Sequence, residues 1–199
     1  MNNHIVLLGD SIFDNAPYVG PTGKPIIDYL NENLGENNRA TLLAEDGATI
    51  SDVTQQAKDL PKDTTHIFLS IGGNNIRKYT SILEETDTSV LEVLNNFYEL
   101  RESFEREYFL LLKELKDIGI PLTVCTIYNC SFEGEERQRA VEVALALFND
   151  AIIRSTYRLS VPYIELRDVC TEPSDYVSNI EPSDSGGRKI AGVIDKSNN

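Results

Sequence analysis

The sequence predicts an α/β fold, in which a doubly wound parallel sheet of five strands lies between helices in a three-layer αβα sandwich. Two observations predict it. Short apolar runs alternate along the chain with longer segments of helical periodicity, which is the pattern of βαβ units. Several of the runs are apolar at nearly every position, as expected for parallel strands that are covered on both faces.

The five strands are expected at residues 4–8, 40–44, 66–71, 122–127 and 162–166. A chain of 199 residues is long enough for one domain with a sizeable core. The chain shows no repeat, low-complexity segment or interdomain linker. We therefore expect a single domain over residues 1–199.

The clearest helix is predicted to begin at Ser89, which forms a capping-box pattern with Glu92. Gly119 and Pro121 are typical of its end. Its apolar residues recur at spacings of three, four or seven and are expected to pack in the core; they are Val90, Leu94, Phe97, Phe104, Tyr108, Leu111 and Leu115.

Two further helices are predicted nearer the C-terminus. The first carries Val141, Leu145, Phe148 and Ile152 on one face, and the second starts just after Pro182. Their apolar faces are also expected to pack in the core, not against a partner.

The charge and cysteine content exclude several classes of function. A net charge of -14 argues against nucleic-acid binding and disfavours anionic membranes. No segment reads as a signal peptide or a transmembrane helix. The three cysteines have neither disulfide-framework nor metal-ligand spacing. We therefore expect a cytoplasmic protein, of undetermined oligomeric state, without a metal site.

Four short polar or glycine-containing blocks lie just past predicted strand ends or before the last helix. They are Gly9-Asp10-Ser11, Gly47, Gly72-Gly73-Asn74-Asn75 and Ser178-Asn179-Ile180-Glu181-Pro182. Ligands of open α/β sheets bind at the carboxyl ends of the strands. We therefore expect these blocks to meet at one edge of the sheet.

Together the four blocks resemble the signature blocks of the GDSL/SGNH hydrolases, and the resemblance spans essentially the whole chain. It implies a flavodoxin-like SGNH hydrolase fold and a carboxylic-ester hydrolase that acts on small or medium acyl esters without a cofactor. Ser11, on an exposed turn, would be the nucleophile. The backbone N–H groups of Ser11 and Gly47 and the amide of Asn74 would stabilise the oxyanion.

Further residues of the same edge are expected to contact the substrate. Tyr128 and Phe132 lie in the loop after the fourth strand. Asn75 replaces the aspartate of the family pattern Gly-x-Asn-Asp. The predicted substrate contacts are Asp10, Gly73, Asn75, Tyr128 and Phe132.

The last block departs from the family, in which it reads Asp-x-x-His-Pro and its histidine activates the serine. Here Ser178 replaces the aspartate and Glu181 replaces the histidine. The two histidines, His4 and His66, open predicted strands. At about 3.3 Å per residue they lie roughly 15 Å from the serine edge, which excludes both as the base.

Glu181 is therefore the candidate general base. The ordinary pKa of a glutamate, about 4.3, makes a weak base, but burial or the nearby Asp175 and Asp184 would raise it. The alternative is a structural carboxylate at the start of a helix. Cys130 lies in the overhanging loop, but a cysteine nucleophile would also need a base or a lowered pKa.

Two other functions compete with the esterase. A catalytically weak or inactive protein of the same fold would bind an acylated ligand or a protein partner, because two catalytic positions are altered. A nucleotide-binding protein is disfavoured, because the sequence has neither a phosphate-binding loop nor G-x-G-x-x-G after the first strand.

Overall fold

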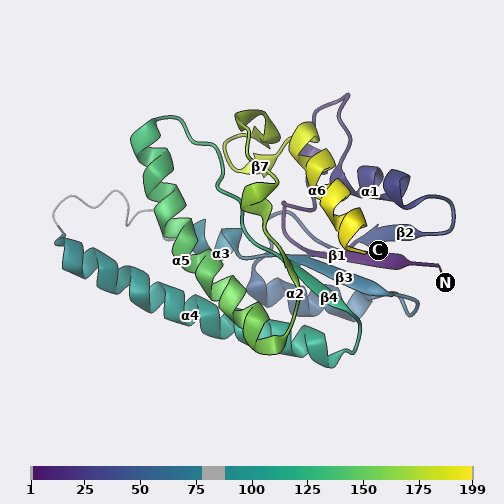
Figure 1. The fold of residues 1–199 in the computed structure, drawn as a ribbon, viewed down its shortest axis with the longest axis horizontal. Coiled ribbons are helices and arrows are strands. Elements are labelled where there is room, and N and C mark those ends of the chain that lie inside the picture. The colour runs from purple at the N-terminus through teal and green to yellow at the C-terminus, as the bar shows by residue number, and fades with distance from the viewer. Residues whose placement is uncertain (1, 78–87, 199) are drawn as a thin grey trace.

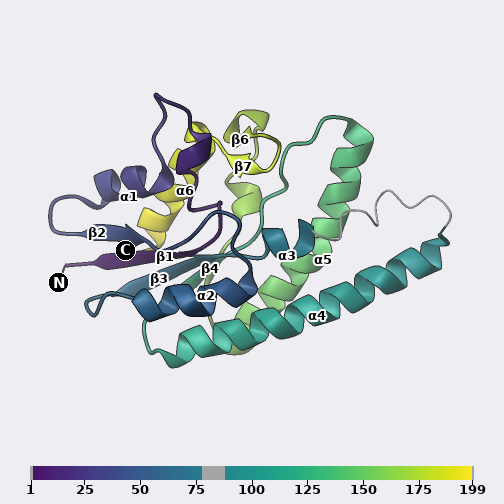
Figure 2. The same cartoon turned by 180° about the vertical axis from the view of Figure 1, so that it is seen from behind.

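The computed structural model describes residues 2–77 and 88–198, which form an open sheet with helices on both faces (Figures 1 and 2). The strands are β1 (His4–Gly9), β2 (Arg39–Leu42), β3 (His66–Ser70), β4 (Leu122–Cys125) and β5 (Tyr163–Ile164). Their order is β2-β1-β3-β4-β5, and every neighbouring pair is parallel. The predicted αβα sandwich with a five-stranded parallel sheet is confirmed.

Alternate residues of β1 enter two separate cores, because successive side chains of a strand point to opposite faces. One core lies under α1 (Ile26–Leu34) and α6 (Asp184–Ser197). The other lies under α2 (Ile50–Gln56), α4 (Val90–Asp117) and α5 (Glu135–Leu159). Because both faces are covered, the strand is buried along its whole length.

Short elements connect these layers at the edge where the strands end. They are α3 (Gly73–Arg77), the 3-10 turns η1 (Ala16–Tyr18), η4 (Leu166–Asp168) and η5 (Pro173–Asp175), and the hairpin of β6 (Tyr176–Val177) and β7 (Glu181–Pro182). A further 3-10 turn, η2 (Ala57–Asp59), follows α2 and precedes the start of β3. None of the helices in the described part of the chain is long and apolar enough to span a membrane.

The fifth strand is shorter than the predicted residues 162–166. The hydroxyl of Thr126 accepts a hydrogen bond from the Leu166 N–H (2.9 Å) and donates one to Glu165 Oε1 (2.6 Å). A side chain thus takes the place of strand pairing, and η4 begins at Leu166.

The prediction that the whole apolar stripe of α4 packs in the core is wrong for its first turns. Ser89 caps the helix as predicted, its hydroxyl accepting the Glu92 N–H (3.2 Å). Yet Val90 is 76% exposed and Leu94 is 58% exposed, whereas Tyr108 is fully buried. The reason is length, because 28 helical residues span about 42 Å and a six-residue strand only about 20 Å.

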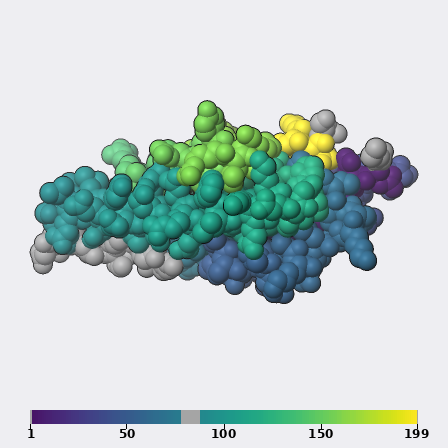
Figure 3. Space-filling view, turned by 90° about the horizontal axis from the view of Figure 1, so that it is seen from below, coloured from purple at the N-terminus to yellow at the C-terminus, as the bar shows by residue number. Residues whose placement is uncertain are grey.

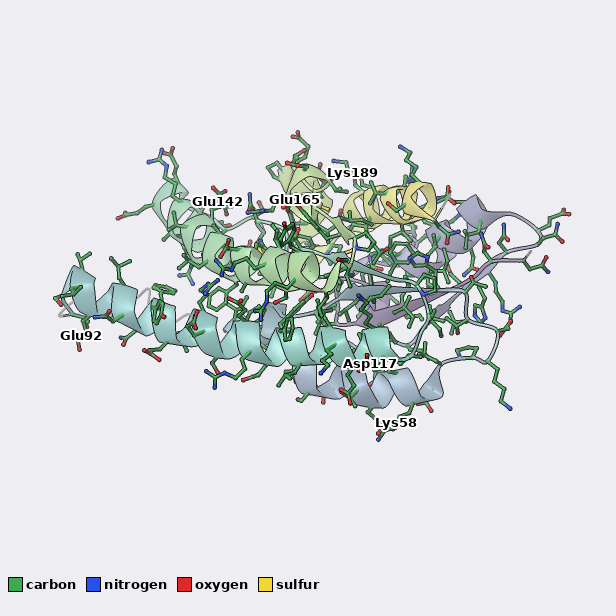
Figure 4. The ribbon with its side chains drawn as sticks, turned by 60° about the horizontal axis from the view of Figure 1, so that its bottom comes forward. Lys58, Glu92, Asp117, Glu142, Glu165 and Lys189 are labelled. Atoms are coloured by element: carbon green, nitrogen blue, oxygen red, sulfur yellow. The ribbon has the colours of Figure 1, made fainter. Side chains whose placement is uncertain are left out.

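The views agree with this explanation. Figure 3 shows α4 running along most of one face of the molecule. In Figure 4 Glu92 lies at the end of α4 that projects past the sheet, and Asp117 lies at the other end.

We expect Gly9→Ala to lower the free energy of unfolding by more than about 4 kcal/mol. Gly9 has φ +135°, and a β-carbon there would lie 1.8 Å from the carbonyl oxygen of Ser70. Chemical denaturation measures the loss. Gly119→Ala is the control, because its φ is +84° with no atom within 4 Å of the added carbon, and about 1–2 kcal/mol is expected. Equal losses would contradict the clash at Gly9.

Candidate active site

The first strand ends in a turn that the side chain of Gln56, on α2, holds in place. Its amide accepts a hydrogen bond from the Gly9 N–H and donates one to the Gly9 carbonyl, each 2.8 Å long. The Asp10 N–H then donates to the carbonyl of Ser70, at the end of β3 (3.1 Å). These bonds satisfy the backbone polar groups where β1 leaves the sheet. They also fix the position of the next residue, Ser11.

Ser11 borders a cavity of about 130 Å³ at the carboxyl ends of the strands. Only 8% of the residue is exposed, so the prediction of an exposed turn is wrong. The reason is that Tyr128, Ile180 and Glu181, from distant parts of the chain, line the cavity beside it. Most of the remaining wall is apolar and consists of Ile76, Ile127, Phe132, Val141, Ala144 and Leu145.

The hairpin of β6 and β7 brings Glu181 to the cavity. Val177 pairs with Glu181 in antiparallel register, and the turn between them contains two residues of positive φ, Ser178 (+52°) and Asn179 (+70°). Ser178 is exposed at this turn. Glu181 itself is 7% exposed, and it lies in a strand before α6 and not in the helix.

The surroundings of Glu181 change its affinity for a proton. Burial raises the pKa of Glu181, a hydrogen bond with the Ser11 side chain lowers it, the charge of Asp46 raises it and the charge of Arg77 lowers it. The net pKa is raised. The Oε2 atom is buried and has no hydrogen-bond partner among the described residues.

The two carboxylates expected to raise this pKa do not do so. Asp175 is fully buried and is paired with Lys189 (2.6 Å). Asp184 accepts hydrogen bonds from the Lys24 N–H (2.8 Å) and the Tyr29 hydroxyl (2.7 Å). Both carboxylates are thus engaged elsewhere, and Asp46 supplies the like charge.

Asp10, immediately before Ser11, is the second buried carboxyl group that lines the cavity. It is 2% exposed. Burial, followed by the charges of Glu181 and Asp46, raises the pKa of Asp10 to about 7, although the Ile12 N–H bond acts against this rise. Asp10 therefore holds a proton for much of the time near neutral pH.

Asn74 lines the cavity and joins two of the predicted blocks. Its Nδ2 donates a hydrogen bond to the carbonyl of Ala48 (2.9 Å), which places the turn at Gly47 beside it. Gly47 has φ +80° in this turn but does not line the cavity. The second hydrogen on Asn74 Nδ2 is available for a ligand, because an amide nitrogen carries two.

Asn75, predicted to contact the substrate, does not line the cavity. Its Oδ1 instead accepts a hydrogen bond from the N–H of Ile50 (3.0 Å), the first residue of α2. The side chain is turned to this helix because the first N–H groups of a helix lack partners within it. Asn75 therefore holds α3 against the start of α2.

The other predicted contacts, Gly73, Tyr128 and Phe132, line the cavity. The Tyr128 hydroxyl donates a hydrogen bond to the Ile180 carbonyl (2.7 Å), which ties the loop after β4 to the hairpin. Cys130 also lines the cavity, but burial and the charge of Glu181 raise its pKa to about 12. It is therefore a thiol at neutral pH, not a nucleophile.

Both histidines lie at the amino ends of their strands, away from Ser11. His4 is buried and contacts Asp63 (3.0 Å) and Thr41 (2.7 Å). His66 contacts Thr123 (2.9 Å). In residues 2–77 and 88–198, no three His, Cys, Asp or Glu side chains form a cluster that could hold a metal ion.

The sequence reasoning missed the side chains that fix the strand ends. The amide of Gln56 forms hydrogen bonds with both the N–H and the carbonyl of Gly9. The amide of Asn149 does the same at Ile127, accepting from its N–H (2.9 Å) and donating to its carbonyl (2.8 Å). Both amides belong to helices and point toward the sheet. A polar residue next to the apolar stripe of a buried helix is the signal that would have found them.

The sequence model of the GDSL-like lipase/acylhydrolase family matches residues 5–191, and the chain belongs to this family. Comparison with curated proteins finds no match. The fold is similar to the lipase Lip_vut3 from a goat rumen metagenome, with TM-score 0.75, 16% identity, and 98% and 97% of the two chains covered.

Two enzymes from Streptomyces also have this fold, each with TM-score 0.71 and 14% identity. One is the extracellular lipase of Streptomyces rimosus, with 98% of this chain and 99% of that chain covered. The other is phospholipase A1 of Streptomyces albidoflavus, with 100% and 99% covered.

We expect Asn75→Ala to lower the free energy of unfolding by about 1 kcal/mol, because the Ile50 N–H loses its partner. Asn75→Asp keeps an acceptor at this helix start and should cost less. Thermal and denaturant unfolding of the two variants compare them. A larger loss in the aspartate variant would contradict this role of Asn75.

Proposed function

We propose that the protein is a carboxylic-ester hydrolase with Ser11 as the nucleophile and Glu181 as its general base. The observation that carries this proposal is that Ser11 and the buried carboxyl group of Glu181 line the same cavity, where the Ser11 side chain acts to lower the pKa of Glu181. The described residues that line the cavity include no histidine or lysine. Glu181 therefore takes the role that the resemblance assigns to a histidine.

In the proposed reaction, Ser11 Oγ attacks the ester carbonyl while its proton passes to Glu181. The negative charge on the carbonyl oxygen is stabilised by the N–H of Ser11 and by the amide of Asn74, which line the cavity. The N–H of Gly47, the third predicted donor, lies in the turn next to Asn74 and outside the cavity lining. Burial of Glu181 assists this step, because a carboxylate with a raised pKa is a better base. Water then releases the acyl group from Ser11.

The substrates we propose are small or medium acyl esters. A cavity of about 130 Å³ with a mostly apolar wall suits a short acyl chain, and its few polar groups lie next to Ser11. We propose no cofactor and no nucleic-acid or membrane partner. A single domain and a cytoplasmic location remain predictions, and all three cysteines are free.

We expect Ser11→Ala to abolish hydrolysis of p-nitrophenyl acetate without unfolding the protein. Glu181→Gln should lower kcat/KM by about 100-fold or more, since general-base catalysis contributes that much. Asp184→Asn is the control carboxylate, because Asp184 is bound to Lys24 and Tyr29, not Ser11. Equal losses for the two carboxyl variants would refute Glu181 as the base.

The same assay distinguishes the esterase from an inactive binding protein. If the wild type shows no turnover that depends on Ser11, but Glu181→His gains it, the native chain binds its ligand without hydrolysis. Turnover that disappears with Ser11→Ala supports the esterase.

We expect kcat/KM for p-nitrophenyl acetate to fall as the pH is lowered, because Glu181 accepts a proton only when it is ionised. The pKa of Glu181 is raised, so the acid limb should lie above the ordinary value of about 4.3. The charge of Arg77 lowers this pKa, and Arg77→Gln should therefore move the limb to higher pH. A limb at or below pH 4 would exclude Glu181 as the titrating base.

A further inference from the structure

The cavity contains two buried carboxyl groups, but the proposed reaction uses only one of them. Asp10 is 2% exposed and Glu181 is 7% exposed, and both line the cavity beside Ser11. Asp10 Oδ1 accepts the Ile12 N–H at 3.1 Å. The position of a β-carbon on Gly73 is 3.9 Å from Asp10 Oδ2. Because Gly73 has no side chain, Oδ2 is not covered on that side.

Although the cationic Arg77 also lines the cavity, Asp10 forms no ion pair with any described residue. The groups that act on it electrostatically come from several elements. Glu181 comes from β7 and Asp46 from the turn after β2, while Tyr108 comes from α4 and Tyr128 from the loop after β4.

These surroundings favour the protonated form of Asp10. Burial raises the pKa of both tyrosines well above their ordinary value, so both are neutral hydroxyls. Glu181 and Asp46 are acidic and repel a negative charge on Asp10. Two carboxyl groups that share a site do not both ionise readily. Because its pKa is raised to about 7, Asp10 is the carboxyl group of this cavity that can hold a proton near neutral pH.

We propose that Asp10 is a second catalytic residue, a carboxylic acid that protonates the departing alcohol while Glu181 serves as the base. This inference rests on the proposed esterase function. It follows a general rule, that two titratable groups whose surroundings separate their proton affinities divide the acid and base roles between them.

The proton balance of acylation closes with these two groups. The Ser11 Oγ–H bond breaks, its proton passes to Glu181, and Oγ forms a bond to the carbonyl carbon. When the bond from that carbon to the alkoxy oxygen breaks, this oxygen takes the proton of Asp10. The alcohol leaves, with Glu181 protonated and Asp10 ionised.

Deacylation restores the starting state. Asp10, now ionised, takes a proton from the attacking water, whose oxygen bonds to the acyl carbon. The bond from this carbon to Ser11 Oγ then breaks, and Oγ takes the proton back from Glu181. The acid is released, and both carboxyl groups have regained their original protonation.

The test compares two acetate esters whose leaving groups differ in whether they must be protonated by a general acid. The p-nitrophenolate ion is a stable anion and leaves without taking up a proton. The ethoxide ion is strongly basic, so its oxygen has to be protonated as it leaves. We expect Asp10→Asn to lower kcat/KM for ethyl acetate at least ten-fold more than for p-nitrophenyl acetate. The parameter kcat/KM isolates acylation here, because it does not include hydrolysis of the acyl-enzyme.

The outcomes separate this inference from the proposed function. Equal losses for the two esters in Asp10→Asn, with Ser11→Ala inactive on both, would mean that Asp10 is structural while the esterase proposal stands. Turnover that persists in Ser11→Ala would overturn both. A selective loss for the ethyl ester supports the acid role.

A second measurement needs only the wild type and therefore does not depend on the folding of Asp10→Asn. Asp10 acts as an acid only when protonated, so kcat/KM for ethyl acetate should fall as the pH rises through about 7. The p-nitrophenyl ester should show no such basic limb. The charge of Asp46 raises the pKa of Asp10, so Asp46→Asn should move the limb to lower pH. A limb common to both esters would overturn the proposal.

Discussion

The paired hydrogen bonds between the Gln56 amide and Gly9 decide where the first strand stops, and the rest of the site depends on them. At the end of a parallel strand both the N–H and the carbonyl need a partner, and an amide side chain supplies an acceptor and a donor together. The carbonyl of Gly9 also accepts the Glu45 N–H (3.1 Å), so it is the buried N–H of Gly9 that would lose its acceptor without Gln56, which is costly. Asn149 does the same for Ile127 at the end of β4. Two helices thus fix the chain where β1 and β4, the two neighbours of β3, come to an end.

The fold could be predicted from the sequence because it depends on local patterns. Apolar runs marked all five strands, although the last is only Tyr163–Ile164. The positions of the four blocks after the strand ends predicted that they meet at one edge of the sheet. Ser11, Asn74 and Glu181, from three of these blocks, line one cavity there. These predictions succeeded because parallel strands direct their carboxyl ends to the same edge.

What the sequence could not show were properties set by distant partners. The burial of Ser11 depends on a hairpin some 170 residues away in sequence. The pKa of Glu181 depends on Asp46 and Arg77, neither of which is near it in the chain. Asn75 matched the family block well, yet its side chain binds α2 because a helix start lies within reach. The exposed turns of α4 follow from the short strands beneath it, which a helical stripe does not reveal.

The cavity brings together residues that follow the first strand and residues of the hairpin just before α6, and this has a consequence for synthesis on the ribosome. Ser11 follows β1, whereas Glu181 lies on a hairpin that Asp175 anchors to Lys189 of α6, labelled in Figure 4. The helix α6 in turn packs against α1. The proposed nucleophile, Ser11, is therefore synthesised long before the proposed base, Glu181, and domains generally fold as units. A nascent chain therefore carries the Ser11 turn through some 170 further residues before Glu181 is made, so the proposed pair of side chains can meet only after the hairpin has been synthesised.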